Sequence, residues 1–238
     1  MAKAPALKLV IGNKNYSSWS MRPWVLARQA GIAFEEVQLK FDEVDGGLRV
    51  AGIEPYSPTR KVPVLLVDGE PVWDSAAICE TLAELHPEKQ LWPAAAEARR
   101  VARSICAEMH SSFQGMRGAM PMNIRASLPG KGRDPKSEQD IERIIAIWTS
   151  CRSRFGRGGD FLFGRFSVAD AFYAPVAFRI QTYGLTLDTA SAAYADRLLN
   201  TRSMREWYAD ALKETLRDQP HDDEITQVGR VVEDLRAR

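Results

Sequence analysis

A serine-rich turn is the first place in this sequence where residue types and spacing could do chemistry. Ser17 and Ser18 lie between a short β-favouring run at residues 7–11 and a helical pattern that begins near Ser20. The hydroxyls and backbone N–H groups of a turn that opens a helix face the positive end of the helix dipole, where an anion is stabilised. Serine before a helix is most often only an N-cap, so the turn becomes a site only if other residues converge on it.

The first ninety residues alternate between strand-like and helix-like patterns. The expected strands are 7–12, 34–39, 62–67 and 71–73, and the expected helices are 19–31, a short irregular 42–52, and 75–86. The first half has the crossover spacing of parallel strands, whereas Asp68-Gly69 is a tight hairpin signal. The order βαβαββα therefore predicts an α/β domain with a mixed sheet.

Pro63 is unusual because it lies inside the strongly apolar run at residues 62–67. Proline cannot donate to a strand ladder, so it belongs at the start or the edge of a strand. A proline that turns the chain tightly there could be cis, which would expose the backbone of Val62 to a ligand.

From Leu91 onward the periodicity is helical only, which predicts an all-α second domain. The expected helices are 101–120, 141–155, 168–177, 190–199 and 202–217. The capping-box variant at 167–170 opens a helix that should be central and buried. Five apolar residues at spacings of three and four predict a last amphipathic helix, with a frayed end as the alternative: Ile225, Val228, Val231, Val232 and Leu235. A boundary at 87–94 gives domains 1–87 and 94–238.

The composition and charge bound the class of partner. The chain is 45% hydrophobic and 26% charged, with 32 Lys and Arg against 31 Asp and Glu. This near-neutral balance argues against nucleic acid or an anionic membrane as the main partner. No window approaches the ~18 consecutive apolar residues of a membrane helix. The start, Met1 to Pro5, is followed by strand-like sequence, so no signal peptide is expected.

The cysteines and histidines show no metal-ligand spacing. The three cysteines are far apart, and each lies in an apolar helical pattern: Cys79, Cys106 and Cys151. They are best interpreted as small core residues. The three histidines are equally scattered: His86, His110 and His221. We expect no metal site and no disulfide, and a reducing cytoplasm as the location.

Four motifs, in order along the chain, resemble those of the glutathione S-transferases. Residues 17–22, Ser-Ser-Trp-Ser-Met-Arg, resemble the Ser-Ser-Cys-Ser-Trp-Arg turn of the zeta class and of serine-type bacterial members. Residues 61–65 are similar to the strand with the cis-proline, and residues 74–78 to the Glu/Asp-Ser-x-Ala-Ile helix start. Residues 166–170 resemble the capping motif of the second domain. The resemblance implies a thioredoxin-like domain followed by a helical bundle.

The resemblance also implies a role for the serine turn. A free thiol titrates near ~8.5, so little of glutathione is thiolate at neutral pH. A hydroxyl that donates a hydrogen bond to sulfur at a helix N-terminus lowers that pKa and supplies the nucleophile. Ser17 aligns with the first serine of the zeta turn and is the expected donor, with Ser18 as the close second.

The other motifs imply contacts to the rest of the tripeptide. Val62 would pair with its backbone through N–H and C=O groups. Asp74 and Ser75 would hold the γ-glutamyl carboxylate and ammonium, and Lys61 or Arg60 could pair with the glycine carboxylate. The expected glutathione-binding residues are Trp19, Lys61, Val62, Pro63, Asp74 and Ser75. Glutathione is thus the expected co-substrate.

A hydrophobic electrophile is the expected second substrate. Its pocket should lie between the domains and face a helix whose methionines and aromatic make a pliable apolar wall. The residues expected there are Met109, His110, Phe113 and Arg117. The resemblance further implies a homodimer.

Trp19 is a departure from the zeta class, which has a cysteine at that position. It weakens the alternative of a zeta-like isomerase, and it argues against members that form mixed disulfides with glutathione. The remaining alternative is a non-catalytic glutathione-binding or carrier protein of the same fold.

Overall fold

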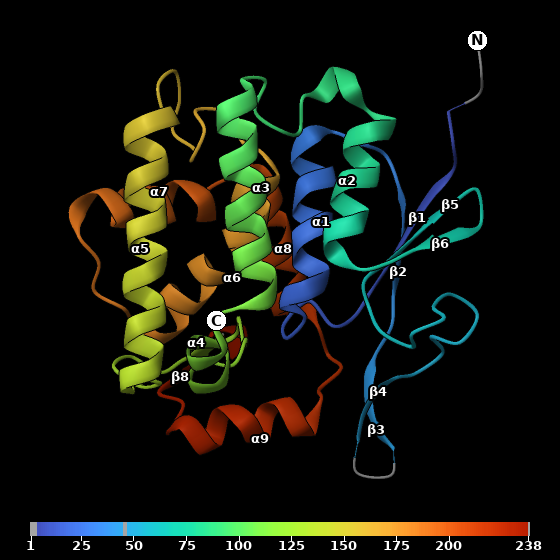
Figure 1. Ribbon diagram of the computed structural model, residues 1–238. Helices are drawn as coiled ribbons and strands as arrows, with labels where there is room; N and C mark the ends of the chain where they lie inside the picture. The colour runs from blue at the N-terminus through green and yellow to red at the C-terminus, as the bar shows by residue number, and fades with distance from the viewer. Residues whose placement is uncertain (1–3, 45–46, 238) are drawn as a thin grey trace.

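The N-terminal residues form a four-stranded mixed sheet in this computed structural model, which describes residues 4–44 and 47–237 (Figure 1). The strands are β1 (Leu7–Ile11), β2 (Glu35–Gln38), β5 (Val64–Val67) and β6 (Glu70–Val72), in the order β2-β1-β5-β6. β1 pairs parallel with β2 and antiparallel with β5, and β5 and β6 form the hairpin. The predicted mixed sheet is confirmed.

Two helices, α1 (Ser18–Ala30) and α2 (Ser75–Leu85), lie between this sheet and the helical half of the molecule (Figure 1). Ser17 caps the start of α1. Gly31 ends it in the left-handed conformation (φ 67°), where its N–H donates to the carbonyls of Ala27 and Arg28. Because α1 packs on the sheet and on the helices behind it, its middle residues are almost wholly buried.

The predicted helix at 42–52 is wrong. The chain forms a separate hairpin there, β3 (Phe41–Val44) with β4 (Gly47–Val50), in which Phe41 lies opposite Val50. The glycines of this stretch disfavour a helix, while Val44 and Val50 favour strands. The N-terminal domain therefore departs at this point from the predicted βαβαββα order.

The second half is helical, as predicted. Its helices are α3 (Ala96–Ser111), α4 (Gln114–Ala119), α5 (Pro135–Phe155), α6 (Val168–Tyr183), α7 (Thr189–Leu199), α8 (Arg202–Lys213) and α9 (Gln219–Val228), with a short 3-10 turn at Pro87–Lys89 before them. α6 lies inside this half, between α1 and α5 (Figure 1), and nearly all its residues are buried. The expected α/β plus all-α fold is thus confirmed.

The helix predicted over 101–120 is interrupted between α3 and α4. Phe113 adopts a left-handed conformation (φ 65°), which breaks the helix, and its ring is buried. Asp140 on α5 accepts a hydrogen bond from the backbone N–H of Met116 at 2.8 Å, which fixes the new start. Burial of one aromatic ring and a carboxylate from a distant helix thus outweigh local helical periodicity.

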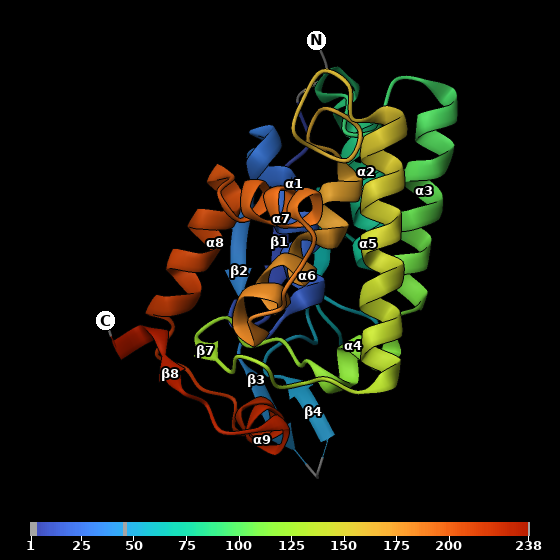
Figure 2. The same ribbon diagram turned by 90° about the vertical axis from the view of Figure 1, so that its left-hand side faces the viewer.

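The last predicted helix lies earlier than expected. α9 ends at Val228, because Gly229 is extended, and it lies beside the β3–β4 hairpin in Figures 1 and 2. The apolar residues that follow leave the helix, and β8 (Glu233–Asp234) pairs with β7 (Ala126–Ser127) instead. The C-terminal segment is therefore tied to the body by strand pairing.

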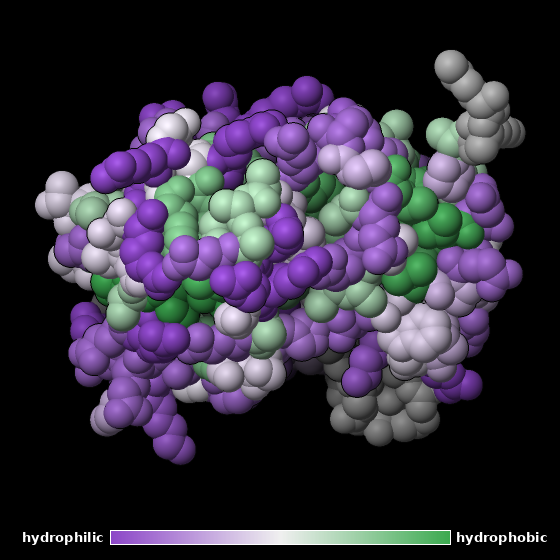
Figure 3. All heavy atoms as spheres, turned by 45° about the horizontal axis from the view of Figure 1, so that its top comes forward, coloured by the Kyte–Doolittle hydropathy of each residue, from purple (hydrophilic) through white to green (hydrophobic). Residues whose placement is uncertain are grey.

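Polar residues cover most of the face shown in Figure 3, and apolar residues appear there in separate areas. The three cysteines are free and buried, as predicted. Among residues 4–44 and 47–237, no cluster of His, Cys, Asp and Glu side chains could hold a metal ion. None of the helices in those ranges is long and apolar enough to cross a membrane.

The start of α6 depends on one buried carboxylate. Asp170 accepts hydrogen bonds from the backbone N–H groups of Ser167 (2.9 Å) and Leu162 (3.1 Å) and from the hydroxyl of Tyr194 (3.0 Å). These bonds favour the charged form, but burial outweighs them and raises the pKa of Asp170 to about 6. The carboxyl group is therefore more basic in the folded chain than in the unfolded chain.

The contribution of Asp170 to the free energy of unfolding is expected to fall as pH rises from about 4 to about 6. In that window the folded state binds more protons than the unfolded state, so deprotonation favours unfolding, by roughly 3 kcal/mol in total. Urea unfolding at several pH values would measure the slope, with Asp170→Asn as the comparison because it cannot titrate. Equal slopes in the two proteins would contradict the prediction.

Candidate functional site

A cavity of about 410 Å³ lies where the N-terminal half meets α3. Its lining residues come from the start of α1, the loop before β5, the start of α2 and α3: Trp19, Thr59, Lys61, Val62, Pro63, Trp73, Asp74 and His110. Five of the six residues expected to bind glutathione line it, and the sixth, Ser75, follows Asp74 directly. Segments far apart in the sequence therefore converge on one cavity.

The two serines at the start of α1 differ in their hydrogen bonds. The Ser17 hydroxyl donates to Ser20 Oγ at 2.7 Å and accepts from the Ser20 N–H at 3.3 Å, so it caps the helix. Ser20 Oγ also accepts from the N–H of Gly12 at 3.2 Å. The hydroxyl of Ser18, which is also buried, has no hydrogen-bond partner among the residues described by the structure. Of these two serines, Ser18 is therefore the one with an uncommitted proton.

Trp19 forms a half-buried wall of the cavity and contacts one imidazole and two guanidinium groups. The ring of His110 meets its edge at 5.0 Å between centroids. The guanidinium carbon of Arg22 lies 4.2 Å from the indole centroid, and that of Arg117 lies 5.1 Å from it. The cavity wall thus carries an aromatic ring backed by positive charge.

Asp74 joins the two halves of the chain at the cavity. Its Oδ1 accepts the N–H of Ala76 at 3.0 Å and so caps α2, while its Oδ2 lies 3.1 Å from Nε2 of His110 on α3. The hydroxyl of Ser75 is buried and has no hydrogen-bond partner in the described parts of the chain. A carboxylate and an unsatisfied hydroxyl therefore lie next to each other at a helix N-terminus, a place that favours anions.

The loop before β5 supplies the opposite wall. The Val62–Pro63 peptide bond is cis, as the sequence suggested. Ser57 holds this loop, because its hydroxyl accepts from the N–H of Lys61 at 3.3 Å and donates to the carbonyl of Lys61 at 3.0 Å. Lys61 is exposed and lines the cavity, whereas Arg60 does not line it. Of the two cations considered from the sequence, Lys61 is therefore the one that lines the cavity.

The residues expected in the second-substrate pocket are divided by the structure. His110 lines the cavity. Met109 and Phe113 are buried in the core, so they are not open to it. Arg117 is half-buried beside Trp19 and donates to the backbone carbonyl of Ser112 at 3.1 Å. The amphipathic stripe of this segment therefore serves mainly to pack the helix.

Two lining residues, Thr59 and Trp73, were not predicted. Trp73 is 45% exposed and is one of the few large apolar side chains on the surface. A signal was present in the sequence, because an aromatic residue stands directly between a strand and the predicted cap Asp74. Such a position leaves a large ring at the edge of whatever the cap binds.

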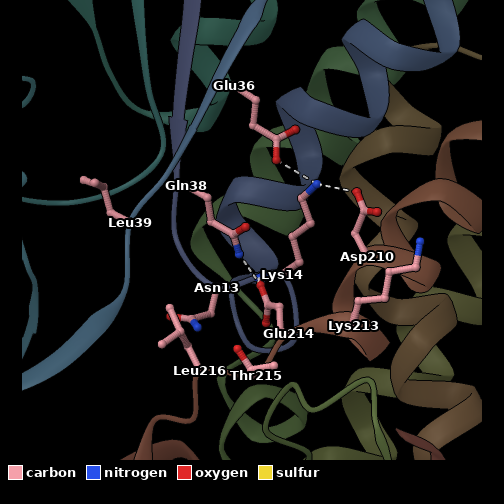
Figure 4. Close-up of a pocket in the computed structure, with 10 residues that line it drawn as sticks. All are labelled: Asn13, Lys14, Glu36, Gln38, Leu39, Asp210, Lys213, Glu214, Thr215 and Leu216. Atoms are coloured by element: carbon pink, nitrogen blue, oxygen red, sulfur yellow. Dashed lines mark hydrogen bonds and ion pairs between the residues drawn. The ribbon is translucent and has the colours of Figure 1, made fainter.

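A second cavity, of about 380 Å³, lies between the turn before α1 and the end of α8 (Figure 4). Lys14 is 3% exposed and places its Nζ 2.8 Å from Glu36 and 2.7 Å from Asp210. The carboxylate of Glu214 accepts from the backbone N–H of Lys14 and from the side-chain amide of Gln38. These charged groups satisfy one another. They form a polar contact between the two halves of the chain, here called the Lys14 contact.

A buried network around Asp222, here called the Asp222 network, also holds the turn before α1. Asp222 accepts from the hydroxyl of Tyr16 at 2.9 Å, from the amide of Asn123 at 3.4 Å and from the guanidinium of Arg125. Burial and the Asp222 carboxylate raise the pKa of Tyr16, so its hydroxyl stays a donor. The residue before Ser17 is thus anchored to α9.

Comparison with known proteins supports the fold and identifies the family. The family models for the glutathione S-transferase N-terminal and C-terminal domains match residues 16–85 and 134–210. Maleylacetoacetate isomerase from Dictyostelium discoideum is 28% identical over 138 residues, which cover 55% of this chain and 60% of that protein. This match spans three fifths of that relative's length. A probable maleylacetoacetate isomerase from Caenorhabditis elegans is 24% identical over 68% of this chain and 76% of its own length.

Solved structures show the same fold at low sequence identity. A glutathione transferase homolog from Burkholderia gl BGR1, with bound glutathione, has a TM-score of 0.66 at 20% identity and covers 88% of this chain and 100% of its own. A glutathione transferase from Methylococcus capsulatus str. Bath has a TM-score of 0.61 at 21% identity, with coverages of 87% and 98%. Because the two family models together match more than half of its residues, this chain belongs to the glutathione S-transferase family.

Proposed function

We propose that this protein is a serine-type glutathione transferase, which uses a serine hydroxyl to activate the glutathione thiol for attack on a hydrophobic electrophile. The observation that carries the proposal is the cavity beside the N-terminus of α1. Asp74 and Lys61, which match the charged ends of the tripeptide, line this cavity together with Trp19. Ser17 and Ser18 do not line it, but Ser18 directly precedes Trp19 and its buried hydroxyl makes no hydrogen bond among the described residues.

The proposed orientation of glutathione follows from the charges. The γ-glutamyl ammonium pairs with Asp74, while its carboxylate accepts from the hydroxyl of Ser75 and the first N–H groups of α2. Val62 pairs with the peptide backbone, and Lys61 meets the glycine carboxylate. This orientation directs the thiol toward the start of α1.

Ser18 is the proposed donor to sulfur, although Ser17 was the first choice from the sequence. The Ser17 proton is already donated to Ser20 Oγ, so its use at sulfur would cost that buried hydrogen bond. Ser18 has no such commitment. A hydroxyl in this place stabilises the thiolate over the thiol without itself becoming a nucleophile or a base.

The electrophile is proposed to lie against Trp19, Trp73 and His110, which give the cavity an aromatic wall open to solvent. Flat aromatic surfaces favour apolar substrates. The homodimer and the cytoplasmic location expected from the sequence stay predictions.

A glutathione-dependent isomerase is the second candidate, because both curated relatives carry the name maleylacetoacetate isomerase. Trp19 stands where the zeta turn has a cysteine, which weighs against it. A non-catalytic glutathione carrier is the third, and the uncommitted hydroxyl of Ser18 favours catalysis over it.

Calorimetric titration with glutathione, followed by a conjugation assay with an aromatic halide, tests the proposal. Binding with turnover is expected. Binding without turnover would favour the isomerase or the carrier. No binding at millimolar glutathione would overturn the site assignment itself.

Asp74→Ala is expected to weaken glutathione binding by about tenfold or more, because it removes a charged hydrogen-bond partner. Asp188→Ala is the matched control, since Asp188 also caps a helix through its side chain but lies at α7. Each change costs about 1 kcal/mol of stability through the lost cap. Equal affinities in the two variants would contradict the role of Asp74.

A further inference from the structure

Arg22 is a fully buried cation without a carboxylate partner in the described parts of the chain. Its Nε and Nη1 atoms are buried and have no hydrogen-bond partner there. The guanidinium instead lies between two aromatic rings, 4.2 Å from the centroid of Trp19 and 4.9 Å from that of Phe172. A buried charge is normally paired, so an unpaired one requires an explanation.

The groups around Arg22 do not supply a negative charge. Arg117 on α4 and Arg179 on α6 add positive charge, and Arg179 donates to the backbone carbonyl of Met120 at 2.8 Å. Cys79 on α2 and Cys106 on α3 are close, but burial raises the pKa of both thiols, so they are neutral at pH 7.

Asp74, the carboxylate that lines this cavity, lies 3.1 Å from Nε2 of His110 and makes no ion pair with Arg22, while Lys61 adds a cation to the cavity. The charged side chains that act most strongly on Arg22 are therefore both cations, Arg117 and Arg179. Burial lowers the pKa of Arg22 to about 9, which leaves the guanidinium charged at neutral pH. The arrangement thus maintains a cation in a place where a charge is expensive to bury.

The position of Arg22 on α1 relates this cation to the proposed thiol site. Arg22 follows Ser18 by four residues, so the two share one face of the helix. The guanidinium of Arg22 lies over the ring of Trp19, the residue that directly follows Ser18. Trp19, whose ring contacts this guanidinium, lines the cavity. One indole ring thus separates the cation from the cavity.

We propose that Arg22 is the buried counter-charge of the glutathione thiolate, held behind Trp19; this inference rests on the proposed function. When the S–H bond breaks, the electron pair stays on sulfur and the proton leaves to solvent, while Arg22 remains protonated. A cation behind one ring in a partly buried site lowers the pKa of a thiol by about one unit. Arg22 does not touch the substrate. It is a positioning residue, which holds a positive charge behind the indole ring of Trp19.

The pKa of the bound thiol is the direct test, measured from the ultraviolet absorbance of the thiolate as pH is varied with glutathione bound. Arg22→Met, which keeps a long apolar side chain between the two rings, is expected to raise that pKa by about one unit, a tenfold loss of thiolate below it. Arg22→Lys keeps the charge and should retain most of the low pKa. Affinity for S-methylglutathione, which has no thiol proton, should stay within about twofold.

Arg28→Met is the matched control on the same helix. Arg28 also stacks on a tryptophan, with its guanidinium carbon 5.3 Å from the centroid of Trp24, but it is half-exposed and paired with Glu36 and Glu206. Its replacement should leave the thiol pKa unchanged. If Arg22→Met does not fold, Arg22→Gln compared with Arg22→Lys replaces it as the neutral variant.

The outcomes separate this inference from the proposed function. If the wild-type protein does not bind S-methylglutathione, the proposed function fails, and this inference fails with it. If the neutral variant binds S-methylglutathione and its bound thiol keeps the wild-type pKa, only the role of Arg22 is overturned. An equal rise of the thiol pKa in Arg28→Met would also overturn it, because the effect would then not depend on which arginine of α1 is replaced.

Discussion

Ser18→Ala is expected to reduce conjugation turnover by about 100-fold, the usual cost of one lost donor to a developing anion. Its hydroxyl has no competing partner among the described residues, so it is the proton available to stabilise the thiolate. Glutathione affinity should change by no more than about twofold, because the proposed contact of the hydroxyl is with sulfur alone. Steady-state kinetics with an aromatic halide, together with calorimetry, separate the two effects.

Ser17→Ala is the comparison for this prediction. It removes the N-cap of α1 and should cost about 1 kcal/mol of stability, with a fall in turnover below about tenfold. The reverse pattern, a silent Ser18→Ala and a damaging Ser17→Ala, would assign the sulfur contact to Ser17. Thermal unfolding of both variants distinguishes lost stability from lost chemistry.

Asp222→Ala is expected to lower the free energy of unfolding by about 3 kcal/mol, near the lower end of the range for breaking a buried ion pair. The change leaves the hydroxyl of Tyr16 and one arm of Arg125 without their acceptor. Arg125 keeps Asp234, whose carboxylate lies 2.7 Å away, which limits the loss. Urea unfolding at neutral pH measures it.

The neighbouring carboxylate provides the control for Asp222. Asp223 lies on the same helix but is exposed, and it accepts from the amide of Gln219 at 2.7 Å. Asp223→Ala should therefore change the free energy of unfolding by less than about 0.5 kcal/mol. Losses of the same size in both variants would show that the Asp222 network is not a major source of stability.

Elements with strong local signals could be predicted from the sequence. Gly31 ends α1 because glycine readily adopts the left-handed conformation, here with φ 67°, that closes a helix. The capping box of Ser167 and Asp170 starts α6. Five of the six expected glutathione-binding residues also line one cavity, because the family motifs lie on the elements that surround it. Signals within a few residues of each other were sufficient for this much.

Features that depend on distant contacts could not be predicted. The break at Phe113 is fixed by a carboxylate on another helix, Asp140, and β8 exists only because Ala126–Ser127 lies beside it. The same is true of charges. Nothing near Arg22 in the sequence indicates that its guanidinium is buried between two rings, one of them contributed by Phe172.

The Lys14 contact has a consequence for the order in which the chain acquires its structure. The backbone of Lys14 bonds with Glu214 and with Trp207, partners that stand 200 and 193 residues later in the chain. Contacts of such long range form late, because the intervening chain must first be brought together. During synthesis, the turn before Ser17 is thus made near the beginning and completed only after α8 has left the ribosome. The nascent N-terminal half therefore lacks the partners of Lys14 for most of translation.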